Sequence, residues 1–174
     1  MLRVSAIIPG AGVGSRFGEK KQFKNLSGEP LWAHTLKPFI LSSLIDEIVF
    51  VVEESLVGII KKSGFFKQFV KKKEIKVTKG GARRMDSVLN GIHVSKKMNE
   101  IVCVHDVARP FVKESLINKT IEACKDYDGA ILAIPSVDTL KSVENEIIKK
   151  TLNRSQTWMA QTPQSFHKDK LLKA

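Results

Sequence analysis

The chain has 174 residues, of which 43% are hydrophobic, and it carries a formal net charge of +11 at pH 7. That length fits a single globular domain with a sizeable core. No apolar run approaches the roughly 18 residues of a membrane-spanning helix, and the amino terminus does not read as a signal peptide, so we expect a cytoplasmic protein without a membrane partner. The charge permits nucleic acid as a partner, but no stretch interleaves aromatic side chains with lysine and arginine, so we expect no nucleic acid either.

Neither the cysteines nor the histidines are spaced as metal ligands. Cys103 lies in a strand-like run and Cys124 in a helix-like run, and both are predicted to be buried free thiols. The four histidines are scattered along the chain, which argues against a zinc site.

Residues 4–9 form a nearly continuous apolar run, as expected of a strand buried on both faces of a parallel sheet. A glycine-rich, basic loop follows, with Gly10, Gly12, Gly14, Gly18, Arg16, Lys20, Lys21 and Lys24. Glycines let backbone N–H groups approach an anion, and the cations add positive charge. The loop therefore predicts a cradle for a polyphosphate, with an ordinary strand-to-helix turn as the alternative.

This loop matches neither of two familiar phosphate-binding patterns. A P-loop requires a lysine between a glycine and a hydroxyl residue, and no lysine of the loop has those neighbours. A dinucleotide-binding fingerprint requires glycine where Ser15 and Phe17 stand. The loop is therefore assigned to another class of nucleotide binder.

The rest of the chain alternates predicted helices and strands. Further strands are expected at residues 48–52, 75–78, 101–104 and 130–135. One predicted helix has Pro30 at its first position, and another covers residues 56–69 with Gly64 as a candidate break. Further helices are expected to begin at Asp86-Ser87 and to cover residues 114–127 and 168–174. The alternation predicts a three-layer α/β sandwich with a mostly parallel sheet and right-handed crossovers.

In such sheets ligands bind beyond the carboxyl ends of the strands. We therefore expect the glycine loop to meet residues 80–87, 106–109 and 136–141. Asp106 is a carboxylate at a strand tip beside the polyphosphate cradle, a position that favours Mg²⁺, which takes hard oxygen ligands and bridges phosphates. The alternative for Asp106 is a helix cap or an ion-pair partner for Arg109.

Residues 137–158 interrupt the alternation with short apolar pieces among polar residues. They are predicted to form a hairpin arm that extends from the domain, with a long mobile loop as the alternative. An isolated hairpin is marginal in water, so we expect the arm to pair with the same arm of a second chain.

Six motifs, in this order, resemble the 2-C-methyl-D-erythritol 4-phosphate cytidylyltransferase family: PGAGVGSRFG, KKQF, GGARRMDSV, VHDVARPF, VDTLK and NRSQTWMAQTPQSF. The resemblance implies a Rossmann-related fold of the nucleotide-diphospho-sugar transferase type. It implies transfer of CMP from CTP to 2-C-methyl-D-erythritol 4-phosphate in non-mevalonate isoprenoid biosynthesis, with release of pyrophosphate. It also implies a magnesium cofactor and a homodimer formed through residues 137–158.

The resemblance assigns roles to three groups of residues. The catalytic residues would be Arg16, Lys21 and Arg154. The CTP-binding residues would be Gly10, Ala11, Gly12, Val13, Gly14, Gly81, Ala82 and Ser87. The residues that bind the sugar-alcohol phosphate would be Asp106, Val107, Arg109, Thr139 and Thr162, with Asp106 also the metal ligand.

The sequence departs from this family at two places. Ala82 stands where the family often has an acidic residue, and the family normally continues for several dozen residues past the TPQSF motif. Residues 1–174 are therefore expected to be a nucleotidyltransferase domain that is short at its C-terminus, a fragment, or the first half of a fused protein.

Two other functions remain open at this point. The first is the sister activity toward ribitol 5-phosphate, although Arg154 four residues before Trp158, with Val137-Asp138-Thr139, favours methylerythritol phosphate. The second, from another class, is a non-catalytic basic binding protein without the family's C-terminal tail.

Overall fold

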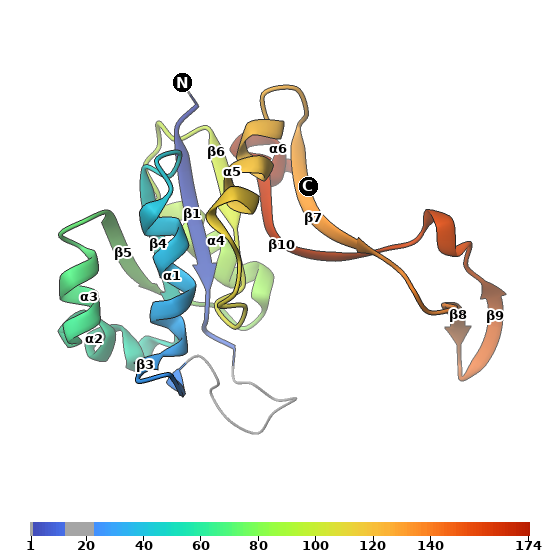
Figure 1. The fold of residues 1–174 in the computed structure, drawn as a ribbon, viewed down its shortest axis with the longest axis horizontal. Coiled ribbons are helices and arrows are strands. Elements are labelled where there is room, and N and C mark those ends of the chain that lie inside the picture. Colours follow the sequence, from blue (N-terminus) through green and yellow to red (C-terminus); the bar gives the residue numbers. More distant parts are fainter. Residues whose placement is uncertain (1, 13–22) are drawn as a thin grey trace.

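The computed structural model describes residues 2–12 and 23–174, and within them a six-stranded sheet has the order β5-β4-β1-β6-β10-β7 (Figure 1). Its strands are β1 (Val4–Pro9), β4 (Glu47–Val52), β5 (Glu74–Lys79), β6 (Ile101–Val104), β7 (Gly129–Pro135) and β10 (Trp158–His167). Strands β5, β4, β1 and β6 pair in parallel, and β10 runs antiparallel to both of its neighbours. The predicted mostly parallel sheet is confirmed.

Six helices lie along the described part of the chain: α1 (Leu31–Leu41), α2 (Glu54–Lys62), α3 (Gly64–Phe69), α4 (Arg84–Val94), α5 (Glu114–Ala123) and α6 (Lys168–Lys173). Successive strand residues point to opposite faces of the sheet. In β1, Ala6 and Ile8 therefore join the core under α1, α2, α3 and α5, whereas Ile7 joins a second core under α4 and α6. Helices on both faces make the predicted three-layer sandwich. No helix among the described residues is both long and apolar enough to cross a membrane.

The helix boundaries differ from the predicted ones at several places, and α2, for example, begins at Glu54, two residues before the predicted start. Pro30 ends the short strand β3 (Glu29–Pro30), which pairs with β2 (Asn25–Leu26), so this proline precedes α1 instead of opening it. Helix α4 begins at Arg84, two residues before the predicted start. Helix α5 ends at Ala123, because residues 124–127 continue as turns with backbone hydrogen bonds mostly three residues apart.

Strand β10 was not predicted, and it holds the sheet's main irregularity. Ala160 lies opposite Ala133 and Gln164 lies opposite Ile131, so three residues of β10 face one residue of β7. The peptide bond between Thr162 and Pro163, inside this bulge, is cis. Bulges re-aim side chains and are common beside active sites, and this one turns Thr162 toward the end of β6.

Residues 137–158 hold a further two-stranded sheet, formed by β8 (Lys141–Glu144) and β9 (Ile147–Thr151). Asn145 and Glu146 form the turn with positive φ angles of 48° and 63°. A short 3₁₀ helix, Arg154–Gln156, leads back to β10. Figure 1 shows this arm projecting away from the six-stranded sheet.

Candidate functional site

Three loops meet at the carboxyl edge of the parallel strands, where backbone hydrogen bonds tie them to the strand ends. The Gly10 N–H donates to the carbonyl of Val51 at 2.7 Å, and the Gly80 N–H donates to that of Val52 at 2.8 Å. The Val107 N–H donates to the carbonyl of Pro9 at 3.2 Å. The start of the first loop, the second glycine corner (residues 80–87) and the Asp106–Arg109 loop therefore converge, as the topology predicted. Residues 136–141, which were also expected here, instead lead from β7 into the arm that projects away from the sheet (Figure 1).

Ala11 of the first loop packs directly on the second glycine corner. A Cβ atom on Gly80 would overlap the Cβ of Ala11 and would lie 2.7 Å from the Ser87 Oγ. The Gly81 N–H donates to the same Ser87 Oγ at 3.1 Å, and Ser87 is buried. Ala82, the next residue, is exposed. The predicted CTP-binding residues Ala11, Gly81 and Ser87 are thus within one tightly packed corner.

The Asp106 carboxylate lies between two arginines. Arg84, at the start of α4, donates to its Oδ1 at 2.8 Å, and Arg109 donates to its Oδ2 at 3.3 Å. Arg109 also donates to the Gln161 side chain in β10. Asp106 therefore makes the ion pair with Arg109 that the sequence left open as its alternative role.

His105 is fully buried immediately before this carboxylate. Its Nδ1 lies 3.0 Å from the Thr162 Oγ1, and its Nε2 lies 3.0 Å from the carbonyl oxygen of Arg109. Thr162 also accepts a hydrogen bond from the Asp106 backbone N–H at 3.3 Å. Burial lowers the pKa of His105 below its ordinary value. Two predicted substrate-binding residues, Arg109 and Thr162, are therefore joined through a histidine that sequence reasoning did not assign to the site.

Val107 and the arm residues are placed differently from the others. The Val107 side chain is buried against Gly10, and its carbonyl accepts a hydrogen bond from Thr35 at 2.6 Å. Thr139 and Arg154 belong to the arm, and Arg154 donates to the Val137 carbonyl at 3.3 Å. Four further predicted residues, Val13, Gly14, Arg16 and Lys21, lie outside the described residues.

The structure adds Arg84, His105 and Gln161 to the residues around Asp106. For His105 the sequence held one signal, its position beside a strand-tip carboxylate. Arg84 lies within residues 80–87, the second glycine corner, which the topology already predicted at this edge of the sheet. Gln161 gave no signal, because its contact depends on the irregular part of the unpredicted strand β10.

The donor set fits a metal ion that arrives with a polyphosphate. Among residues 2–12 and 23–174, no group of three or more His, Cys, Asp or Glu side chains could hold an ion by itself. Magnesium is commonly bound through one or two carboxylates plus substrate phosphates. Asp106, partly exposed at the edge where the loops meet, offers the single carboxylate that this arrangement needs.

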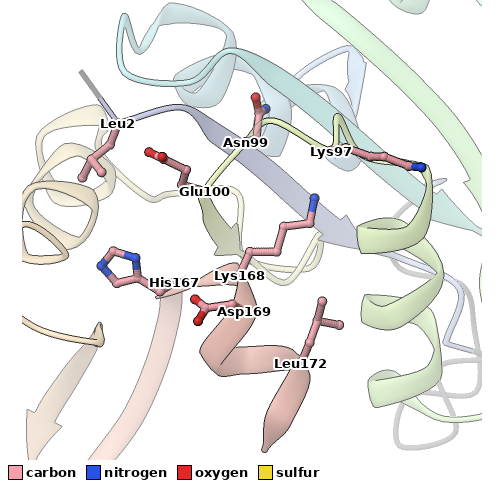
Figure 2. A pocket seen from close by; sticks show the side chains of 8 residues that line it. All are labelled: Leu2, Lys97, Asn99, Glu100, His167, Lys168, Asp169 and Leu172. Carbon is pink, nitrogen blue, oxygen red and sulfur yellow. The ribbon is translucent and has the colours of Figure 1, made fainter.

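A cavity of about 560 Å³ lies elsewhere, at the amino ends of β1 and β6 (Figure 2). Leu2 and Glu100, which precede those strands, line it together with Lys168 and Leu172 of α6. Ligands of parallel α/β sheets bind beyond the carboxyl ends of the strands. The cavity is therefore separate from the site around Asp106.

Comparison with known proteins gives a consistent result over nearly the whole chain. The family model described as 2-C-methyl-D-erythritol 4-phosphate cytidylyltransferase matches residues 4–174. Proteins of that name from Geotalea uraniireducens and Clostridium acetobutylicum are 37% and 40% identical to this chain. Those alignments cover 95% and 97% of this chain and 72% and 74% of the relatives.

Solved structures of similar name have the same fold. The 4-diphosphocytidyl-2C-methyl-D-erythritol synthase of Anaerococcus prevotii superposes with a TM-score of 0.82 at 30% identity, over 99% of this chain and 78% of that one. The 2-C-methyl-D-erythritol 4-phosphate cytidylyltransferase of Francisella tularensis gives a TM-score of 0.73 at 32% identity, over 95% of this chain and 72% of that one.

Proposed function

The chain belongs to the 2-C-methyl-D-erythritol 4-phosphate cytidylyltransferase family, and from that membership we propose how its residues carry the reaction. The enzyme transfers CMP from CTP to 2-C-methyl-D-erythritol 4-phosphate in the non-mevalonate pathway. The products are 4-diphosphocytidyl-2-C-methyl-D-erythritol and pyrophosphate. The match over residues 4–174 carries this conclusion, and it favours neither ribitol 5-phosphate nor a non-catalytic binding protein.

To catalyse this reaction, the protein must position the two substrates and stabilise the negative charge that develops. A phosphate oxygen of the sugar alcohol attacks the α-phosphorus of CTP in line, and pyrophosphate leaves. A phosphate monoester is already ionised near neutral pH, so no strong base is needed. Negative charge grows on the α-phosphoryl oxygens and on the leaving group. We assign Arg16 and Lys21 to that charge, and Gly10 to Gly14 to the triphosphate.

The second glycine corner would read the cytosine ring. The Ser87 hydroxyl already accepts a hydrogen bond from the Gly81 N–H, and a Cβ atom on Gly80 would collide with both Ser87 and Ala11. The position of this hydroxyl is therefore fixed before the nucleotide binds. A site that is rigid in advance loses little entropy when the ligand binds. Ala82 offers only backbone groups for this contact, since its side chain has no polar atom.

Arg84 and Arg109 would bind the phosphates, and Asp106 would bind the magnesium ion that accompanies them. Guanidinium groups bind phosphate with the same paired N–H geometry that they use for carboxylates. When phosphates enter, the two arginines can therefore turn from Asp106 to the substrate, which leaves the carboxylate oxygens for magnesium. The ion, when bound, would neutralise part of the phosphate charge.

The arm would make the enzyme a homodimer. Its hairpin exposes Val143, Ile147 and Ile148, and Trp158 is also exposed at its base. Apolar side chains gathered on one exposed arm are typical of an interaction surface. Pairing with the same arm of a second chain would cover them and bring Thr139 and Arg154 to a substrate site. We also propose a cytoplasmic location for this enzyme.

The test is pyrophosphate release by the purified chain with CTP, magnesium and either methylerythritol phosphate or ribitol 5-phosphate. Turnover should occur with the first sugar phosphate, and Lys21→Ala should keep the fold and lose about 10²-fold in rate, the scale for deleting one preorganised donor. Release at the wild-type rate by Lys21→Ala would refute the role of Lys21. A preference for ribitol 5-phosphate would refute the substrate.

A further inference from the structure

His105 joins two elements of the site that are distant in sequence. Its ring is fully buried and packs against Phe39, with ring centroids 5.1 Å apart. One ring nitrogen faces Thr162 in the β10 bulge, and the other faces the Arg109 carbonyl in the loop after β6. A residue that only filled space in the core would not need both contacts, since a phenylalanine would fill it as well.

The partners determine which nitrogen carries the proton. A carbonyl oxygen can only accept, so the contact with Arg109 requires a proton on Nε2. The Thr162 hydroxyl carries one proton, and the Nδ1 of His105 is an acceptor within its reach at 3.0 Å. Nδ1 then accepts from the Thr162 hydroxyl, whose oxygen accepts in turn from the Asp106 backbone N–H.

A single directed chain of hydrogen bonds results. It runs from the Asp106 N–H to Thr162, from the Thr162 hydroxyl to His105, and from His105 to the Arg109 carbonyl. Every member is satisfied, and both ends of the Asp106–Arg109 loop are held against β10. Satisfied buried networks of this kind fix one arrangement of the groups that they join.

We propose that His105, through its hydrogen bonds to Thr162 and to the Arg109 carbonyl, is a positioning residue for binding of the sugar-alcohol phosphate. It does not touch the reacting atoms. It sets the distance between the Arg109 backbone and Thr162, both of which are assigned to the sugar-alcohol phosphate under the proposed function on which this inference rests.

Two substitutions separate the two hydrogen bonds. In His105→Gln the side-chain amide can still donate to the Arg109 carbonyl, but Thr162 loses its acceptor. In His105→Asn the amide oxygen can still accept from Thr162, but the Arg109 carbonyl loses its donor. His105→Phe removes both hydrogen bonds and keeps the contact with Phe39. Each variant leaves at least one buried polar group without a partner.

Steady-state kinetics give the first measurement. We expect each single-bond variant to raise the KM for methylerythritol phosphate about tenfold, the scale of one unsatisfied buried group, and His105→Phe to raise it further. The KM for CTP should stay close to the wild-type value. An equal rise in both KM values, or a wild-type KM in His105→Phe, would overturn the proposal.

Thr120→Val is the matched control. Thr120 shares a buried hydrogen bond of 2.8 Å with Ser165, which is three residues beyond Thr162 in β10. This variant should lower the melting temperature and leave both KM values unchanged. If it raises the KM for the sugar phosphate as much as His105→Gln does, general destabilisation explains the effect and the proposal fails.

The wild-type protein gives a second measurement that needs neither folding variants nor turnover. Two-bond ¹H–¹⁵N NMR spectra distinguish the two neutral tautomers of a histidine ring. Protonated Nε2 and unprotonated Nδ1 are expected for His105, and the opposite tautomer would overturn the proposal. An inactive wild-type enzyme with the expected tautomer would refute the proposed function but not the hydrogen-bond chain.

Discussion

Gly80 lies directly against Ala11, and this contact joins the two glycine corners of the site. Any side chain at position 80 would overlap the Cβ of Ala11 and crowd the Ser87 Oγ. Ala11, at the start of the first loop, therefore packs against the corner assigned to cytosine, and we expect a change at this contact to disturb nucleotide binding.

Gly80→Ala should therefore weaken CTP binding. Overpacking of a tight site costs about 1–3 kcal/mol, so calorimetry should give a dissociation constant raised about tenfold or more. Gly58→Ala is the control, because Gly58 lies in α2 with no atom near its would-be Cβ. That change should add up to about 1 kcal/mol of stability and leave CTP binding unchanged. Unaltered binding by Gly80→Ala would show that the corner gives way easily.

Asp106→Asn should raise the magnesium concentration needed for half-maximal turnover by about tenfold, as expected for one lost interaction with a charged group. Asp86→Asn removes a comparable carboxylate, which pairs with Arg83 at 2.9 Å. Because Asp86 caps helix α4 and pairs with Arg83, its variant should keep the wild-type magnesium requirement. The metal assignment fails if the two variants respond alike.

Glu47 should contribute stability that depends on pH. It is fully buried at the amino end of β4, where it accepts from Ser5 at 2.7 Å and from Lys76 at 2.9 Å. Burial alone would raise its pKa, but the hydrogen bonds from Lys76, the Lys96 backbone and Ser5 together hold the pKa below the ordinary value of 4.5.

A lowered pKa means that Glu47 stabilises the fold fully above pH 4.5 and loses this effect as the pH falls through the shifted value. Glu47→Gln should therefore reduce the free energy of unfolding by about 1–3 kcal/mol at neutral pH. The difference from wild type should shrink in acid. Urea unfolding in a series of buffers measures it, and a difference independent of pH would contradict the argument.

The cysteines should resist alkylation in the folded protein. Cys103 is fully buried, and burial raises its pKa to about 12; burial also raises the pKa of Cys124. The thiolate is the reactive form, so iodoacetamide should modify neither residue until urea unfolds the chain. Mass spectrometry counts the adducts, and rapid labelling without urea would show that the core opens locally.

Ile147→Asp with Ile148→Asp should weaken self-association through the arm. Both side chains are more than half exposed, and losing apolar anchors at the centre of an interface costs roughly 2 kcal/mol or more. Lys150→Ser on the same strand is the control. Sedimentation should show a monomer only for the isoleucine variant, whereas a monomeric wild type at micromolar concentration would exclude the dimer.

Much of the fold was predictable because its central strands are short apolar runs separated by glycine corners and helical periodicity. Strand β10 was not, because its Thr-Pro-Gln segment carries no strand pattern and its pairing depends on β6 and β7 lying on either side of it. The early end of α5 reflects turns that satisfy backbone groups locally, which hydrophobic periodicity does not reveal.

The site was predictable to the level of its loops. Topology alone brought Gly10, Gly80 and Asp106 to one edge of the sheet. Local sequence could not show that His105 faces Thr162, because that contact depends on a bulge in β10. Arg84 was missed for a similar reason, since its partner Asp106 is 22 residues further along the chain.

The chain leaves the six-stranded sheet and returns to it at the same point, because Pro135 of β7 lies opposite Trp158 of β10. The Ser136 N–H still donates to the Thr157 carbonyl at 3.0 Å, just beyond that pair. Residues 136–157 are therefore the connection of a β-hairpin that β7 and β10 form. We therefore expect that replacing this connection by a tight turn would leave unchanged the register that holds Thr162 beside His105.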